Sequence, residues 1–251
     1  MSKSVRSKRV SPGKNKDFSS LLGDSLNEFG VKFVTILKTF LAVYFIPMLV
    51  LLSLFIISLI TYFGFSNLSL LSDEIALREY ILSLTTTNLS GFIFIIFVFV
   101  LFAVLINIFL SLAYFLIAFS NKKESTLREV VSATSKLYWR YIAFIVVVMI
   151  FLTGLFVLLI IPGIIFSVYW VFAPYIFVNE RAGIIESLRR SYRIVKGKWW
   201  MTFGYSLLLF LIYGIVLVAA SFVPFGNIIG TLVLTPIMVI FFKNFYLSMK
   251  K

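Results

Sequence analysis

The chain contains no cysteine and no histidine. Without thiols it can form neither a disulfide nor a thiolate nucleophile, and it lacks the side chains that most often bind zinc and haem iron. Without histidine, general acid-base catalysis would need a carboxylate or a lysine with a shifted pKa, because histidine is the side chain that titrates near neutral pH. We therefore expect no metal, no cofactor and no enzymatic activity.

Charged residues are also scarce, at 13% of the chain, against about a quarter in an ordinary soluble domain. Hydrophobic residues make up 61% of the 251 positions, and the mean hydropathy is +1.05. The net charge of +13 is typical of a protein that contacts either nucleic acid or an anionic membrane surface. The hydropathy decides for the membrane, so we expect a lipid bilayer as partner and no nucleic acid.

The apolar residues gather in runs that predict an all-α, polytopic membrane helix bundle of about six transmembrane helices. The run Tyr141–Val178 would be about 57 Å long as one helix, against about 30 Å for a hydrocarbon core, so it must fold back on itself. Proline and glycine place this turn at Pro162 and Gly163, and a second turn at Pro224. The expected spans cover residues 40–63, 91–119, 141–161, 164–179, 201–222 and 228–248.

Three amphipathic segments precede the odd-numbered spans, with apolar residues every three or four positions. They cover about residues 17–36, 124–138 and 181–198, and we expect them to be helices lying at the cytoplasmic interface. Residues 1–16 are expected to be a flexible basic tail, and residues 17–251 a single membrane domain. The three helix-plus-hairpin units are either true repeats or chance similarity between apolar segments.

The distribution of lysine and arginine predicts the orientation. Alternate connecting segments hold 22 and 1 of the 23 basic residues, which is a positive-inside asymmetry with an even number of crossings. Both termini are therefore expected on the cytoplasmic side of a cell membrane. Trp199 and Trp200, at the start of the fifth span, are expected to be interfacial anchors.

Six basic residues cluster between the fourth and fifth spans. Such a cluster beside membrane helices either binds anionic headgroups or only marks the cytoplasmic side. Because arginine can hold phosphate in a bidentate manner, we favour headgroup contact. The candidate contacts are Arg181, Arg189, Arg190, Arg193, Lys196 and Lys198.

Few polar residues fall within the predicted spans. Asn107 is expected to hydrogen-bond to a neighbouring helix, and Lys243, near the end of the sixth span, to extend toward the interface. Pro47, Pro174 and Pro236 interrupt spans and are expected to kink them, the alternative being that they free backbone groups for a substrate.

The segment Ile161–Trp200 resembles the membrane domain found on bacterial glycerophosphoryl diester phosphodiesterases and its stand-alone multi-pass relatives. The residues that carry the resemblance are Pro162-Gly163, Tyr169-Trp170, Pro174, Glu180, Glu186-Ser187-Leu188, Arg190-Ser191, Gly197 and Trp199-Trp200. In that family a separate soluble domain with histidine, acidic residues and a metal carries out catalysis, and the present sequence has no such segment. The resemblance implies a non-catalytic module in a bacterial cytoplasmic membrane.

Two functions follow as hypotheses. The first is a non-enzymatic membrane module that interacts with anionic lipid or with a protein, including a second copy of itself. The second is a transporter or channel for a small or lipidic solute, suggested by the proline-interrupted spans.

Overall fold

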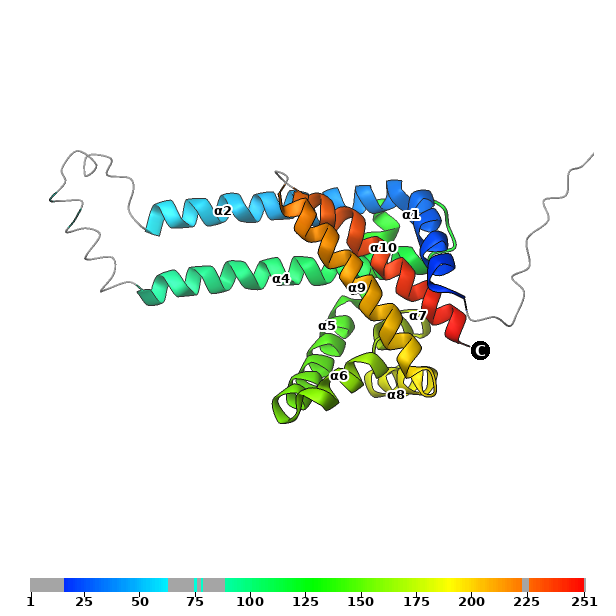
Figure 1. Ribbon diagram of the computed structural model, residues 1–251. Helices are drawn as coiled ribbons and strands as arrows, with labels where there is room; N and C mark the ends of the chain where they lie inside the picture. Colours follow the sequence, from blue (N-terminus) through cyan, green and yellow to red (C-terminus); the bar gives the residue numbers. More distant parts are fainter. Residues whose placement is uncertain (1–15, 63–74, 76–77, 79–88, 223–225, 251) are drawn as a thin grey trace, which may run out of the picture.

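The computed structural model describes residues 16–62, 75, 78, 89–222 and 226–250, and within these ranges the regular structure is entirely helical (Figure 1). This confirms the all-α class. Residues 1–15 of the predicted tail (residues 1–16) and the predicted turn at Pro224 lie outside the described residues. The helices are α1 (Phe18–Phe40), the π-helical segment η1 (Leu41–Phe45), α2 (Ile46–Tyr62), α4 (Leu89–Phe119), α5 (Leu127–Leu158), α6 (Ile160–Tyr169), α7 (Ala173–Glu180), α8 (Ile184–Val195), α9 (Trp199–Ser221) and α10 (Gly226–Met249).

Six helical runs in the described part of the chain are long and apolar enough to cross a membrane. Their outward side chains are large, apolar and exposed, as at Leu49, Phe97 and Val218, so lipid is the solvent they fit. The protein is therefore a multi-pass membrane protein, as the sequence predicted. The runs are Phe18–Thr61, Ser90–Phe119, Leu127–Leu158, Ile160–Glu180, Trp199–Ser221 and Leu232–Met249.

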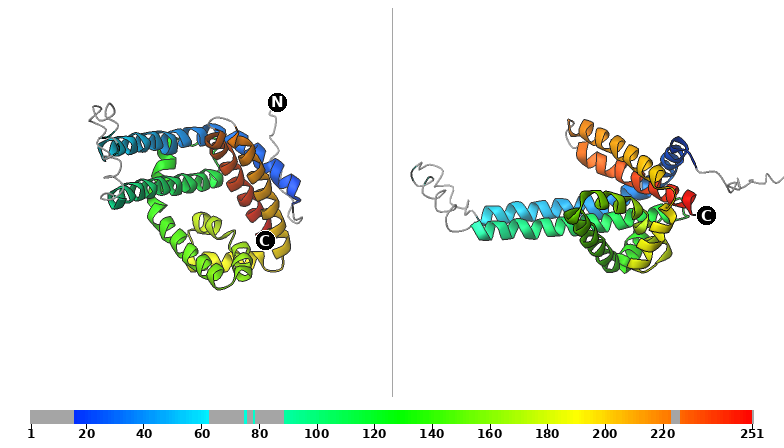
Figure 2. Two further views of the ribbon diagram at one scale, coloured as in Figure 1. Left: turned by 60° about the vertical axis from the view of Figure 1, so that its left-hand side comes forward. Right: turned by 60° about the horizontal axis from the view of Figure 1, so that its bottom comes forward.

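The helices form three hairpins, α2 with α4, α5 with α6, and α9 with α10. The hairpins diverge from one shared region, where α1, the end of α4, the start of α5, α7 and the end of α10 pack together (Figures 1 and 2). We call this region the junction. The most completely buried side chains lie there, including Tyr114, Phe172, Phe241 and Tyr246.

Two of the three expected interfacial helices are not separate elements. Residues 17–36 continue through η1 into the first span, and residues 124–138 are the first turns of α5. A change from amphipathic to apolar pattern alters which solvent a helix faces, but it does not stop the helix. Only α8 is separate, because Gly197, with φ 84°, ends it before α9. Whether the units are repeats stays open.

The turn between α5 and α6 lies at Leu159, whose backbone is extended, and not at Pro162–Gly163. Pro162 falls in the first turn of α6, where a missing N–H removes no intrahelical bond. Gly163 has a packing role instead, because an added Cβ would lie 2.5 Å from the Phe156 ring of α5. The glycine thus permits the close approach of the two helices.

The expected fourth span, residues 164–179, is not one helix. It is interrupted between α6 and α7, and the side chain of Ser191 from α8 fills the interruption: its hydroxyl donates to Tyr169 O at 2.7 Å and accepts from Phe172 N at 3.2 Å. Pro174 therefore starts α7 and does not kink a continuous helix. The same serine fixes the position of α8 against the membrane helices.

The other two prolines lie within helices. Pro236 is inside α10, which continues through it. Pro47 is the second residue of α2, two positions after the end of η1, and since proline has no N–H, an i to i−4 bond cannot form at this point. The wider π-helical turn before Pro47 is consistent with this loss.

Candidate functional site

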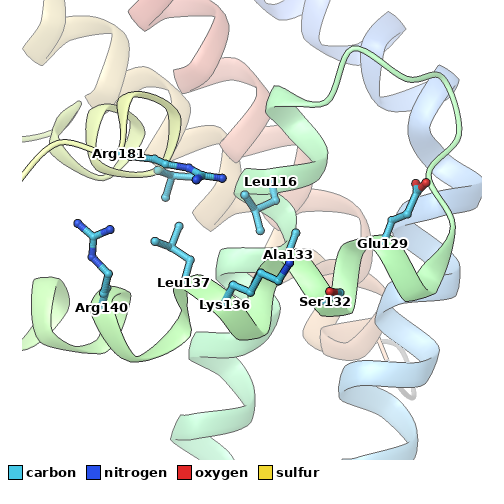
Figure 3. Close-up of a pocket in the computed structure, with 9 residues that line it drawn as sticks. Leu116, Glu129, Ser132, Ala133, Lys136, Leu137, Arg140 and Arg181 are labelled. Carbon is cyan, nitrogen blue, oxygen red and sulfur yellow. The ribbon is translucent and has the colours of Figure 1, made fainter.

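A cavity of about 460 Å³ lies at the junction between α4, α5 and the link that follows α7 (Figure 3). Its volume is within the range of small-molecule binding sites. Its walls combine three basic side chains with apolar ones. The lining residues are Leu116, Glu129, Ser132, Ala133, Lys136, Leu137, Arg140, Val178 and Arg181.

The first side of the cavity is one face of α5. A capping box fixes the start of this helix: Thr126 Oγ1 accepts from Glu129 N, and Thr126 N donates to Glu129 Oε2, each at 3.3 Å. Lys136 and Arg140 follow on α5 four residues apart and therefore lie on the same face. Two like charges at this spacing destabilise the helix by about 0.2–0.5 kcal/mol. The stability of α5 therefore does not explain why both residues are basic.

Arg181 forms the opposite side of the cavity. It ends α7 with a φ of 50°, a left-handed conformation that glycine or asparagine usually occupies at this position. For other residues this conformation costs on the order of 1–2 kcal/mol. The cost is associated with a particular placement: the guanidinium reaches over Leu116 and Leu137, and Arg140 approaches Leu137 from the other side (Figure 3).

None of the three basic side chains has an ion pair in the part of the chain that the structure describes. Glu129, the one carboxylate in the lining, is already engaged by Lys122 Nζ at 2.8 Å and by the capping box. The Arg140 guanidinium lies 5.8 Å from the centroid of the Phe177 ring, a cation-π contact that orients it without neutralising it. The cavity therefore keeps three positive charges.

The chemistry of the lining suits an anion with several acceptor oxygens. Arginine and lysine only donate hydrogen bonds, and the planar guanidinium matches phosphate and carboxylate geometry. Beside these donors, Leu116, Leu137 and Val178 form an apolar wall. The arrangement can hold a negatively charged headgroup with an apolar portion against that wall.

The predicted basic cluster is divided by the structure. Arg190 is held by Glu180 at 2.6 Å and by Glu186 at 2.8 Å, and Arg189 lies 3.7 Å from Glu186. The hydrogen bond from Arg190 lowers the pKa of the Glu186 carboxyl. Glu180 also accepts from Lys250 and Tyr246, so Arg190 belongs to a network that ties α8 to the ends of α7 and α10.

The remaining members of the cluster are Arg193, Lys196 and Lys198, which have no ion pair among the described residues. Of the six predicted residues, only Arg181 lines the cavity. Lys136 and Arg140 were missed, although their four-residue spacing was a readable signal. They sit where an amphipathic segment merges with a span, and were interpreted only as markers of orientation.

The two predicted anchors differ. Trp199 stacks on Phe203 with the rings 5.1 Å apart, and its Nε1 donates to Ile165 O at 3.2 Å, so it joins α9 to α6. Trp200 is 78% exposed and is free to contact a headgroup layer. The anchor role stays a prediction for both.

Lys243 does not extend to the interface, contrary to the prediction. It is buried in the junction, where its Nζ donates to both carboxylate oxygens of Glu28 at 2.6 Å. Lys32 donates to Glu28 at 2.8 Å and to Ile117 O and Ala118 O at 3.0 and 2.9 Å. These carbonyls end α4, where the helix dipole favours positive charge, so one carboxylate and one helix end together balance two lysines.

The prediction for Asn107 was also wrong. Its Nδ2 donates to Ala103 O of its own helix at 2.9 Å, and the residue is exposed. The side-chain amide of an asparagine on a helix can reach the carbonyl four residues earlier, so it does not require a neighbouring helix. Among the described residues, Asn107 therefore makes no hydrogen bond to another helix.

The residues that carry the expected family resemblance, Ile161–Trp200, form most of α6, all of α7 and α8, and the start of α9. Arg181 lies in the middle of this segment and faces the cavity, so the cationic site includes part of the segment. The resemblance itself stays a prediction. Compared with protein-family models, curated proteins and solved structures, the chain has no match.

Proposed function

We propose that this protein is a non-enzymatic membrane module that binds anionic lipid headgroups at its junction, in keeping with its resemblance to the membrane domain of glycerophosphoryl diester phosphodiesterases. One observation carries the proposal: Lys136, Arg140 and Arg181 surround a cavity and have no ion pair in the described part of the chain. Each basic residue near an anionic membrane surface contributes roughly 1 kcal/mol of binding.

The proposal includes an orientation. The start of α1 and the end of α10 both lie on the junction side of the molecule, while the three hairpins point away from it (Figure 1). With the basic segments inside, the junction faces the cytoplasmic leaflet of a bacterial cell membrane, the leaflet in which anionic lipids attract basic residues. Exposed Arg193 and Lys196 on and after α8 add a positive surface at the same level.

The test is lipid selectivity of the purified protein. The protein is reconstituted in nanodiscs of phosphatidylcholine and phosphatidylglycerol. Native mass spectrometry then counts the lipids that stay bound to the protein when it is released from the nanodisc. We expect the wild type to retain phosphatidylglycerol selectively. A triple variant, Lys136→Gln with Arg140→Gln and Arg181→Gln, should lose at least about fivefold of this selectivity, because each removed charge contributed roughly 1 kcal/mol.

The matched control removes the same charge elsewhere. Lys38, Lys123 and Arg128 are exposed, lie outside the cavity and have no ion pair among the described residues, so their change to glutamine should leave selectivity unchanged. An equal loss of selectivity in both triple variants would show that the selectivity depends on net charge and not on this cavity. Unchanged selectivity in the pocket variant would refute lipid binding at this site.

Transport stays an alternative without a supporting observation. The cavity between α2 and α4 is lined by Met48, Leu51, Leu52, Phe55, Ile96, Phe99, Val100 and Ala103, which offer a solute no polar side chain. A protein partner or a second copy of this chain also stays a prediction.

A further inference from the structure

The lining of the junction cavity carries information about the type of anion it fits. The charge, the donor and acceptor balance, and the placement of the three basic residues each bear on this question. Because the inference concerns the same cavity, it rests on the proposed function and specifies its ligand.

The first observation is the size of the uncompensated charge. Lys136, Arg140 and Arg181 contribute three positive charges, and the only carboxylate in the lining, Glu129, already pairs with Lys122. A phosphodiester carries one negative charge and would leave most of this charge uncompensated. A phosphomonoester carries about −1.5 to −2 near neutral pH and matches it better.

The second observation is the excess of donors. Ser132 supplies the only hydroxyl among the lining residues, and both oxygens of Glu129 are engaged, so the side chains offer few free acceptors. Hydroxyl-rich headgroups such as glycerol would need acceptors for their O–H groups. A phosphomonoester dianion has three terminal oxygens that only accept, which complements a lining whose free polar side chains are mainly donors.

The third observation is the direction from which the donors come. Arg140 lines the cavity from α5 and Arg181 from the link after α7, on the opposite side, while the Lys136 side chain extends along α5 toward Ala133 (Figure 3). Donors on two sides can contact different terminal oxygens of one tetrahedral group, and each guanidinium can bind two of them. The left-handed backbone of Arg181 holds the second side in place.

From these observations we propose that the junction cavity is a phosphomonoester site, selective for a terminal phosphate over a phosphodiester. The apolar wall of Leu116, Leu137 and Val178 accommodates the carbon portion attached to the phosphate. Either a lipid with a terminal phosphate, such as phosphatidic acid, or a soluble phosphomonoester presents this chemistry.

The experiment compares three lipids with the full-length protein in nanodiscs: phosphatidylcholine, phosphatidylglycerol and phosphatidic acid. At about pH 8 phosphatidic acid should bind about five- to tenfold more tightly than phosphatidylglycerol, because it offers one further charge to the three cations. The preference should shrink at about pH 5.5, where the terminal phosphate dianion takes up one proton and becomes a monoanion. The charged groups that face the bound phosphate are Glu129, Lys136, Arg140 and Arg181.

A soluble arm separates the two sources. If glycerol 3-phosphate at millimolar concentration displaces phosphatidic acid, the terminal phosphate alone suffices and a soluble ligand is the source. If it does not, the ligand is the lipid. Both outcomes support a phosphomonoester site.

The experiment distinguishes failure of the phosphomonoester inference from failure of lipid binding as a whole. If phosphatidylglycerol and phosphatidic acid bind equally at both pH values, and both are lost in the triple pocket variant, lipid binding stands and the phosphomonoester inference is overturned. If neither binds better than phosphatidylcholine, both proposals fail. To separate binding from folding of the triple variant, Lys136→Gln is also measured alone. Its side chain is exposed, and it should lose about three- to fivefold of the preference.

Discussion

Arg181 combines an unfavourable backbone conformation with a side chain that faces the cavity. At φ 50° a glycine has no Cβ strain, so Arg181→Gly should leave stability unchanged or raise it by up to about 1 kcal/mol, while the selectivity for anionic lipid falls. Thermal unfolding in detergent measures the first effect and native mass spectrometry the second. Arg181→Gln keeps the backbone strain, so it should lose the selectivity for anionic lipid without any gain in stability. Full selectivity in the glycine variant would contradict a binding role.

Glu28 is the one carboxylate that contacts both buried lysines of the junction. Glu28→Gln would leave Lys32 and Lys243 together without a counter-charge, and breaking a buried pair costs about 3–5 kcal/mol. We expect a loss of this size in denaturant titration of the detergent-solubilised protein. Asp24→Asn removes an exposed partner of Lys16 and should cost less than about 1 kcal/mol. Similar small losses in both variants would show that the cluster does not hold the junction together.

At the scale of the helices, the close packing of α9 against α10 depends on one glycine, Gly226. A Cβ on Gly226 would lie 1.9 Å from the carbonyl oxygen of Ala220, a backbone atom that cannot move aside without separating the helices. Gly226→Ala should therefore cost about 1–3 kcal/mol. Gly214→Ala in the middle of α9 meets nothing within 4 Å and should instead stabilise by about 0.5–1 kcal/mol. Thermal unfolding of the two variants should shift in opposite directions; a shift in the same direction would refute this assignment.

Two helices continue where the hydropathy of the sequence changes: α1 runs through η1 into α2, and the amphipathic start of α5 runs into its apolar part. Hydropathy marks where the surroundings change from water to lipid. Helix ends are instead set by backbone conformation, as at Leu159 and Gly197. The sequence therefore predicted the number of spans well and the boundaries of the helices less well.

At the scale of the whole molecule, the proposed orientation places the junction on the cytoplasmic side of the membrane and the hairpin ends on the opposite side. Because the chain has no cysteine, single substitutions can be labelled without background. Lys123→Cys, in the link between α4 and α5, should react with an impermeant maleimide only from the cytoplasmic side. Leu159→Cys, at the exposed end of the α5–α6 hairpin, should react only from the other side. Labelling of both from one side would mean that α5 does not cross the membrane.

The all-α class and the six spans were determined by the sequence alone, because a segment in lipid must satisfy its own backbone hydrogen bonds and the length of an apolar run is a local property. The placement of Arg181 and Arg140 around one cavity, and the ion pair of Glu28 with Lys243 from opposite ends of the chain, were decided by the tertiary structure. Such contacts depend on how the three hairpins converge at the junction, which no local pattern encodes.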